Sequence, residues 1–298
     1  MDRSILQGAY DVHVHAGPSS AKRFEDAYEM YQEASAAGYA GFVVKDHNVP
    51  ALLGTAMINK HNPGPTRAYG ALVLNNSVGG FNVFAVDTAF NYGAAMVYFP
   101  TVSSRMHLET RKEGFVGAAE SALEEIPLAY TDDKGEVVPE AVACLQYMAD
   151  HDMVLGTGHG YPEEVDAVVK KALDLGVKRI VVTHPHYQVD ATIADMVKWA
   201  DMGAYIEINA CVFEGGHSVV ENVIPLQVAK DMIDAVGADR IIIDTDFGQK
   251  ANGSPVEGLY NFLTLLHDDY DVSEEDISKM IKDNPAKCFG FDRLKVIE

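Results

Sequence analysis

The sequence alternates regularly between short apolar runs and amphipathic segments of helical period, and this pattern restricts the possible folds more than any other feature. Eight apolar runs predict β-strands, within residues 9–18 and at 40–47, 67–74, 94–99, 153–157, 179–183, 204–209 and 240–245. The segments between and after them predict helices at residues 24–37, 50–60, 81–92, 140–150, 162–175, 192–202, 218–236, 256–266 and 273–282.

Strands that alternate with helices of this length imply parallel pairing through right-handed crossovers. Eight such units in 298 residues favour a closed (β/α)8 barrel, a TIM barrel, with an extra helix at the C-terminal end. An open doubly wound sheet is the alternative, but no Gly-X-Gly-X-X-Gly follows the first strand. We therefore expect one α/β domain over residues 1–298.

One segment interrupts the rhythm after the fourth strand, at about residues 100–139. It is polar, carries the turn signal Asp132-Asp133-Lys134-Gly135 and is longer than an ordinary loop. We interpret it as an active-site lid or a subunit contact, and we expect a homo-oligomer.

Charge and cysteine content limit the partners and the compartment. A net charge of -21 argues against nucleic acid and anionic membranes, because phosphate binding needs clustered Lys and Arg. No apolar run reaches the roughly 18–20 residues of a membrane span, and the first residues lead almost directly into the first strand, without a signal peptide. The three cysteines are far apart in the sequence. These features predict a cytoplasmic protein.

The first strand carries a His-X-His pair, His13 and His15. Simple alternation would send Asp11, His13 and His15 to one face, and Val12 and Val14 to the other. Two neutral imidazoles one strand repeat apart suit a divalent metal such as Zn, Mn, Fe or Ni. An isolated pair of this kind is also compatible with a half-buried strand that carries histidine by chance.

The ends of later strands carry further polar side chains, and this favours the metal interpretation. They are Lys45 and His47 after strand two, His159 after strand five, His184 and His186 after strand six, and Asp244 and Asp246 after strand eight. In a barrel the carboxyl ends of all strands converge on the one face where active sites are built. The pattern therefore predicts a metal site there.

These motifs resemble the amidohydrolase superfamily, whose members share a distorted (β/α)8 barrel. The resemblance implies that one or two divalent ions, zinc first among them, are bound by His13, His15, His159, His184 and Asp246. It also implies that Asp246 is the catalytic proton shuttle. The sequence further resembles a branch with Lys45-Asp46-His47 on strand two and Asp246-Phe247-Gly248-Gln249 after strand eight, for which the resemblance supplies no activity.

The position of Lys45 differs from that of the metal-binding lysine in the better known members with two metal ions. Those members carry a carboxylated lysine or a glutamate on strand four, whereas here Lys45 lies on strand two. Lys45 has three possible roles: a carbamate that bridges two metals, a cation that holds an anionic substrate group, or a structural ion-pair partner.

Several other residues are candidates for the same site. His47 and His186 are possible metal or substrate ligands, Asp244 is a possible support for a ligand, and Arg105 is the best single candidate for a carboxylate or phosphate clamp. Glu207 and Asn209 at the end of strand seven are within reach of the same face. The remaining histidines have no supporting pattern and are expected in loops or on the surface: His61, His107, His151, His217 and His267.

The favoured function is a metal-dependent hydrolase that acts on a small amide, cyclic imide, lactone or phosphoester. A divalent ion lowers the pKa of water from 15.7 towards about 7, and a neighbouring carboxylate can move the proton. The alternatives are metal-dependent, non-oxidative decarboxylation of a small carboxylic acid, and a metal-containing barrel that binds a ligand without turnover. The substrate is expected to be a small molecule, with an anionic one among the options.

Overall fold

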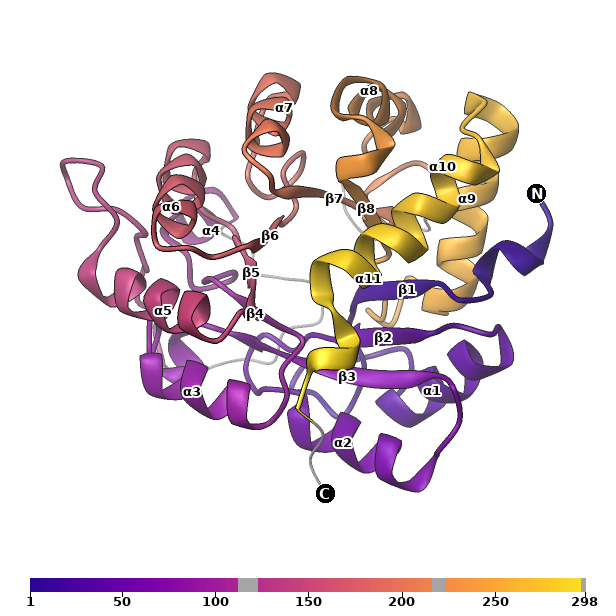
Figure 1. The fold of residues 1–298 in the computed structure, drawn as a ribbon, viewed down its shortest axis with the longest axis horizontal. Coiled ribbons are helices and arrows are strands. Elements are labelled where there is room, and N and C mark those ends of the chain that lie inside the picture. Colours follow the sequence, from indigo (N-terminus) through magenta and orange to yellow (C-terminus); the bar gives the residue numbers. More distant parts are fainter. Residues whose placement is uncertain (112–122, 216–222, 296–298) are drawn as a thin grey trace.

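Eight parallel strands form a nearly closed barrel, which confirms the predicted (β/α)8 fold (Figure 1). The computed structural model describes residues 1–111, 123–215 and 223–295. The strands pair in sequence order and are β1 (Tyr10–Val14), β2 (Gly41–Val44), β3 (Arg67–Val73), β4 (Met96–Tyr98), β5 (Val154–Gly156), β6 (Arg179–Val182), β7 (Tyr205–Asn209) and β8 (Ile241–Asp244).

Helices surround the barrel and bury its outer face (Figure 1). They are α1 (Ala27–Ala36), α2 (Leu52–His61), α3 (Val83–Asn91), α4 (Arg105–Thr110), α5 (Pro139–Asp150), α6 (Pro162–Asp174), α7 (Ile193–Asp201), α8 (Leu226–Val236), α9 (Pro255–Tyr270), α10 (Glu274–Ser278) and α11 (Asn284–Phe289). Short 3-10 turns lie at η1 (Arg3–Leu6), η2 (Asn76–Val78), η3 (Ala210–Val212), η4 (Ala238–Arg240) and η6 (Phe291–Arg293), and the π-helical segment η5 (Lys279–Asp283) joins α10 to α11.

Helix α1 starts three residues later than its apolar pattern suggests, and local capping explains the difference. The Asp26 side chain accepts from the backbone N–H groups of Tyr28 and Glu29, while the Glu29 side chain accepts from the backbone N–H of Asp26. This capping box satisfies N–H groups that lack partners in the first turn, and so it sets the helix start.

The amino-terminal end of the barrel is closed by the C-terminal segment. Phe289 and Phe291 pack against the inward-facing residues of the strands, and the Phe291 ring stacks on Tyr10 at 4.5 Å between centroids. The predicted extra C-terminal helix is therefore present as α10, η5 and α11, and it fills one end of the barrel.

Strand β1 does not alternate as the sequence suggests. Its register with β2 shifts between Asp11 and Val14, which marks a bulge. As a result Val12 packs among the residues inside the barrel, and the Asp11 carboxylate accepts from the hydroxyl of Thr245 at 2.6 Å. The expectation that Asp11 and Val12 follow the alternation of His13 and Val14 is wrong, because the bulge resets it.

The segment after β4 contains more order than its polar composition indicates. It holds the short helix α4, and isolated bridges join Ser104 to Leu128 and Thr131 to Val137.

Among the residues that the structure describes, no helix has the length and apolar character needed to span a membrane.

Candidate metal centre

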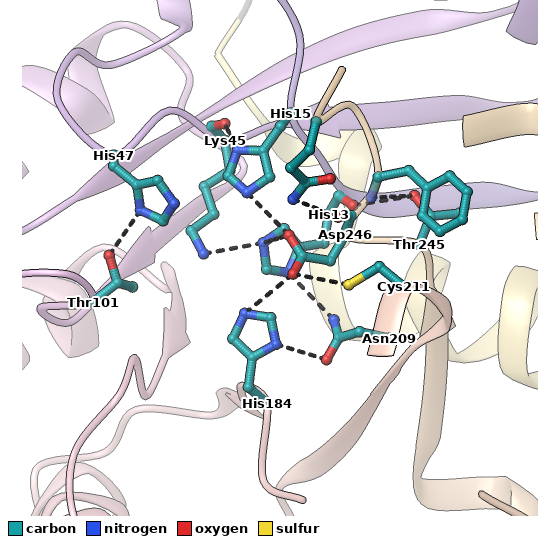
Figure 2. A network of polar contacts seen from close by, with 12 residues as sticks. His13, His15, Lys45, His47, Thr101, His184, Asn209, Cys211, Thr245 and Asp246 are labelled. Carbon is teal, nitrogen blue, oxygen red and sulfur yellow. Dashed lines mark hydrogen bonds and ion pairs between the residues drawn. The ribbon is translucent and has the colours of Figure 1, made fainter. Parts of the chain in front are cut away.

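Most of the polar residues predicted at the strand ends meet at the carboxyl end of the barrel. His13, His15 and His184 surround the carboxylate of Asp246, as Figure 2 shows. His13 and His15 come from the bulged strand β1 and the loop after it, while His184 and Asp246 follow β6 and β8. All four residues are buried.

Hydrogen bonds at Nδ1 orient the two histidines of the His-X-His pair. The Nδ1 of His13 lies 3.1 Å from Glu207 Oε1, and the Nδ1 of His15 lies 2.7 Å from the carbonyl oxygen of Lys45. Both partners are acceptors, so each ring donates its proton from Nδ1. The Nε2 atom of each ring is then an unprotonated lone pair.

His184 is oriented by the same principle through a longer relay. Its Nδ1 lies 2.8 Å from Asn209 Oδ1, and the Asn209 amide donates in turn to Asp244 Oδ1 at 2.6 Å. The bond to Asp244 identifies the oxygen of Asn209 as the acceptor for His184. Asn209 and Asp244 therefore support a ligand instead of entering the pocket themselves.

The three Nε2 atoms converge on Asp246. Those of His13 and His15 lie 3.2 and 3.0 Å from Asp246 Oδ1, and that of His184 lies 3.8 Å from Oδ2. Among the described residues Oδ1 has no hydrogen-bond donor. Lone pairs that face a carboxylate without a proton between them repel one another, and a divalent cation removes the conflict. These residues therefore fit a metal ion.

A second group, His13, His184 and Glu207, is also close enough to hold a metal. Glu207 already accepts from His13 Nδ1 and from the backbone N–H of His184 at 3.0 Å. These bonds engage its carboxylate, so the Nε2 side of the rings is the better site. Burial acts to raise the pKa of Glu207, but the adjacent His13 outweighs burial and holds it below its usual value.

Burial also keeps His15 and His184 neutral. It lowers the pKa of His15 to about 3 and that of His184 to about 4, so neither ring is protonated at pH 7. Burial acts to raise the pKa of Asp246, but His13 and His184 beside it outweigh burial and hold the pKa well below the usual value. His15, His184 and Asp246 are therefore in the forms that bind metal, neutral imidazole and carboxylate.

The backbone at two of these residues is strained. His184 and Asp246 both have a φ of 49°, in the left-handed region that residues other than glycine rarely occupy. The backbone N–H of Asp246 donates to the carbonyl of His13 at 2.8 Å, which helps to hold this conformation. Such strain clusters at functional sites, where the surrounding contacts hold it in place.

Lys45 reaches the same cluster from β2. Its Nζ lies 3.0 Å from His13 Nε2 and 4.8 Å from the centre of the Tyr98 ring, and burial lowers its pKa. No carboxylate in the described part of the chain forms an ion pair with it. Asp246 and Glu207 nevertheless act electrostatically on the Lys45 ammonium. The carbamate, the cationic clamp and the structural ion-pair partner all stay predictions for Lys45.

His159 lies beside the cluster, in contact with a histidine that the sequence did not single out. Its ring centre is 5.1 Å from that of His184, and its Nδ1 lies 3.4 Å from Nδ1 of His107. His107 belongs to α4 and is only 3% exposed. The expectation that His107 is a loop or surface residue is wrong, because the segment after β4 folds back over the strand ends.

The other candidates have different surroundings. His47 lies in the pocket, with its Nδ1 3.1 Å from the hydroxyl of Thr101. His186 stacks on Phe213 at 4.7 Å between ring centres and does not line the pocket. Arg105 donates to Glu164 at 3.1 Å and does not line the pocket either, so the structure gives no support to its predicted role as clamp. His217 lies outside the described residues.

The pocket above the cluster has a volume of about 120 Å³. Besides the predicted residues, its walls include Arg23, His107, Arg111 and Gln249. These residues belong to loops and to the short helix α4, where no strand or helix period marks them. For His107 and Arg111 the sequence signal was the interruption after the fourth strand, which pointed to the segment but not to its residues. Gln249 was part of the motif noted after strand eight, and Arg23 had no signal.

Solved structures confirm the fold and show how widely it is used. The chain resembles an amidohydrolase from Pseudomonas aeruginosa with 12% identity and a TM-score of 0.63, over 97% of this chain and 98% of that one. It also resembles 2,6-dihydroxybenzoate decarboxylase from Rhizobium, with 12% identity and a TM-score of 0.56 over 96% and 99% of the two chains. A lactonase from Listeria monocytogenes has 13% identity and a TM-score of 0.57, over 97% and 96%.

Comparison of sequences gives a family but no activity. No curated protein matches the chain significantly. A family model described as a family of unknown function, DUF6282, matches residues 8–207, a span that includes β1 to β6, the first part of β7 and four of the five predicted metal ligands. The chain therefore belongs to the DUF6282 family.

Proposed function

We propose that this chain is a metal-dependent hydrolase of the amidohydrolase superfamily, acting on a small amide, cyclic imide, lactone or phosphoester. The observation that carries the proposal is the convergence of three unprotonated Nε2 atoms on the Asp246 carboxylate. His13, His15, His184 and Asp246 would hold the ion, with His159 beside them. Zinc suits imidazole and carboxylate ligands at tetrahedral sites, and we propose it as the resident ion.

A bound divalent ion supplies an acidified water and polarises the electrophile. The chain's own residues then supply orientation and proton transfer. Asp246 takes the proton from the attacking water and returns it to the leaving group, because its carboxylate lies at the centre of the cluster and is ionised at neutral pH. Glu207, Asn209 and the Lys45 carbonyl hold the rings of His13, His184 and His15 in place.

The first test is metal content. Protein prepared without chelators should contain about one or two equivalents of a transition metal. Replacement of both His13 and His15 by alanine removes two of the converging nitrogen atoms and should remove most of the metal. Elemental analysis of the two proteins checks this, and unchanged metal in the double variant would disprove the site. His61→Ala, on helix α2 away from the cluster, is the matched control.

The reaction class needs a separate test. Hydrolysis in ¹⁸O-labelled water places the label in the product, whereas decarboxylation releases carbon dioxide and does not need the labelled oxygen. A panel of small lactones, amides, cyclic imides, phosphoesters and carboxylic acids, with mass analysis of the products, distinguishes them. Release of carbon dioxide without incorporation of ¹⁸O would replace the hydrolase with the decarboxylase. A cytoplasmic location and a homo-oligomer remain predictions.

A further inference from the structure

We infer that the pocket selects a small substrate that carries a carboxylate or phosphate group, and that Arg23 and Arg111 bind this group. The inference rests on the proposed function, because it names the class of substrate for the same site. It replaces Arg105 as the anion clamp with two arginines from other loops. Four observations support it: the burial of Arg23, the free donors of both arginines, the charge of the pocket walls and the size of the pocket.

Arg23 has a buried guanidinium group whose N–H groups are not all hydrogen-bonded. Its side chain is 5% exposed, and its Nε has no acceptor among the described residues. The nearest carboxylate is that of Asp46, at 3.8 Å, and this carboxylate already accepts from Ser19 and from the backbone N–H of Asn48. A buried charge is costly unless it is paired, so an anion in the pocket would stabilise Arg23.

The loop that carries Arg23 is fixed to the metal-binding end of β8. Arg23 and Gln249 form an isolated antiparallel bridge, and the backbone N–H of Phe24 donates to the carbonyl of Gly248 at 2.9 Å. Arg23 is thus held close to Asp246, two residues before Gly248. Because the backbone positions it, Arg23 is ready to bind an anion beside the metal ligands.

Arg111 lines the same pocket from the C-cap of α4. Its Nη2 donates to the carbonyl of Tyr187 at 2.8 Å, and its guanidinium carbon lies 4.9 Å from the centre of the Tyr187 ring. These contacts orient the guanidinium and leave its Nε, which is buried, without an acceptor in the described part of the chain. An oriented guanidinium with free N–H groups matches the geometry of a carboxylate or phosphate.

The charge of the pocket walls is opposite to that of the protein. Three lining side chains are basic, Arg23, Lys45 and Arg111, and Asp246 is the one acidic residue among the lining residues that the structure describes. The whole chain carries a net charge of -21. A cationic pocket in an acidic protein attracts anions and repels cations at close range. Its volume of about 120 Å³ limits the ligand to a small molecule.

The test uses zinc-loaded protein and three probes: succinate, inorganic phosphate and the uncharged isostere succinamide. Isothermal titration calorimetry should show binding of succinate, phosphate or both, with succinamide at least about tenfold weaker. The more tightly bound anion identifies the group as carboxylate or phosphate. Equal affinity for succinate and succinamide, with no binding of phosphate, would overturn the inference without any variant.

Variants then test the two arginines. Arg23→Gln and Arg111→Gln should each weaken anion binding by about ten- to a hundredfold, the range for loss of a hydrogen bond to a charged group. Arg23→Lys, which keeps the charge but not the planar fork, should fall between Arg23→Gln and the wild type. The control is Arg67→Gln, which removes an exposed charge at the start of β3 and should change affinity by less than about a factor of two.

Unchanged affinity in either Arg23→Gln or Arg111→Gln, with unfolding temperatures like that of the wild type, would overturn the two-arginine site. So would an equal loss in Arg67→Gln, because that result indicates net charge instead of direct contact. Zinc content is measured in the same samples. Wild-type protein that takes up no zinc contradicts the proposed function, whereas zinc-loaded protein that does not prefer anions contradicts only this inference.

Discussion

At the scale of single residues, the environment of a carboxylate decides its role. Asp244 and Asp246 are two residues apart at the end of β8, and both are buried. Burial and the neighbouring Glu207 raise the pKa of Asp244 well above its usual value, whereas His13 and His184 hold that of Asp246 well below. The surroundings of Asp244 therefore favour its protonated form, and it supports Asn209. Those of Asp246 favour the ionised form, and it faces the pocket.

This difference gives a prediction for a pair of matched variants. Asp246→Asn removes the ionised oxygen that carries the proton, and it should lower turnover by about a hundredfold or more while the protein stays folded and keeps part of its metal. Asp244→Asn replaces a carboxyl group whose surroundings favour the protonated form with a neutral amide of the same shape, so the loss of turnover should be smaller. Steady-state kinetics and elemental analysis on both variants check this. A larger loss of turnover in Asp244→Asn than in Asp246→Asn would show that Asp246 is not the proton shuttle.

At the scale of the elements, closure of the barrel between β1 and β8 positions the metal ligands. The backbone N–H of His15 donates to the carbonyl of Phe247 at 2.7 Å, and that of Asp246 donates to the carbonyl of His13 at 2.8 Å. Gly248 makes this close approach possible. It has a φ of +112°, and a Cβ added there would lie 1.5 Å from the carbonyl oxygen of His15.

Gly248→Ala should therefore disturb both the fold and the metal site. We expect the strained φ to cost about 1–3 kcal/mol of unfolding free energy, and the clash to cost a further 1–3 kcal/mol or so. Gly203→Ala is the control, since Gly203 has a φ of +110° but no atom within 4 Å of the added Cβ. Urea unfolding should show a larger loss for Gly248→Ala, and this variant alone should lose metal. Equal losses would mean that the close approach to His15 is unimportant.

At the scale of the whole molecule, stability depends on a set of histidines that folding keeps neutral. Burial lowers the pKa to about 3 for His15 and His186, to about 4 for His107 and His184, and well below 6.5 for His47 and His159. Between these values and 6.5 the unfolded chain binds more protons than the folded chain. Stability from these groups therefore rises with pH across this range, and it is lost as the pH falls below 6.5.

Three buried carboxyl groups act in the opposite direction. Burial raises the pKa of Asp11 to about 7, that of Glu25 to about 8 and that of Asp244 well above its usual value. Above pH 4–5 or so the folded chain holds protons on these groups that the unfolded chain releases, so their contribution falls as the pH rises. Six histidines outnumber three carboxyl groups, and the net dependence should follow the histidines.

Metal-free protein should accordingly be less stable at pH 5 than at pH 7. For each proton that the unfolded chain binds in excess of the folded chain, the unfolding free energy changes by about 1.4 kcal/mol per pH unit. Urea unfolding in the presence of a chelator measures this, and a midpoint that is higher at pH 5 would contradict the sign. Metal-loaded protein should show a steeper dependence, because protons compete with the metal for the same nitrogen atoms.

The number and type of the elements, and the residues at the strand ends, were predictable from the sequence because both follow from local periodicity. An alternation of apolar and polar residues needs no knowledge of distant contacts, and parallel strands bring their carboxyl ends together in any barrel. Hence the sequence alone predicts that His13, His15, His184 and Asp246 share one face of the barrel, and they lie together there.

The conformations of the loops and of the bulge in β1 could not be predicted from the sequence, because contacts between distant parts of the chain determine them. Arg105 points to Glu164, 59 residues away, while His107, two residues later, turns into the pocket. Asp11 leaves the expected face because Thr245, 234 residues away, offers its hydroxyl where the barrel closes. Such partners exist only once the barrel has formed. For the same reason the sequence marked the histidines that can hold a metal, whereas the arginines that line the pocket were visible only in the folded chain.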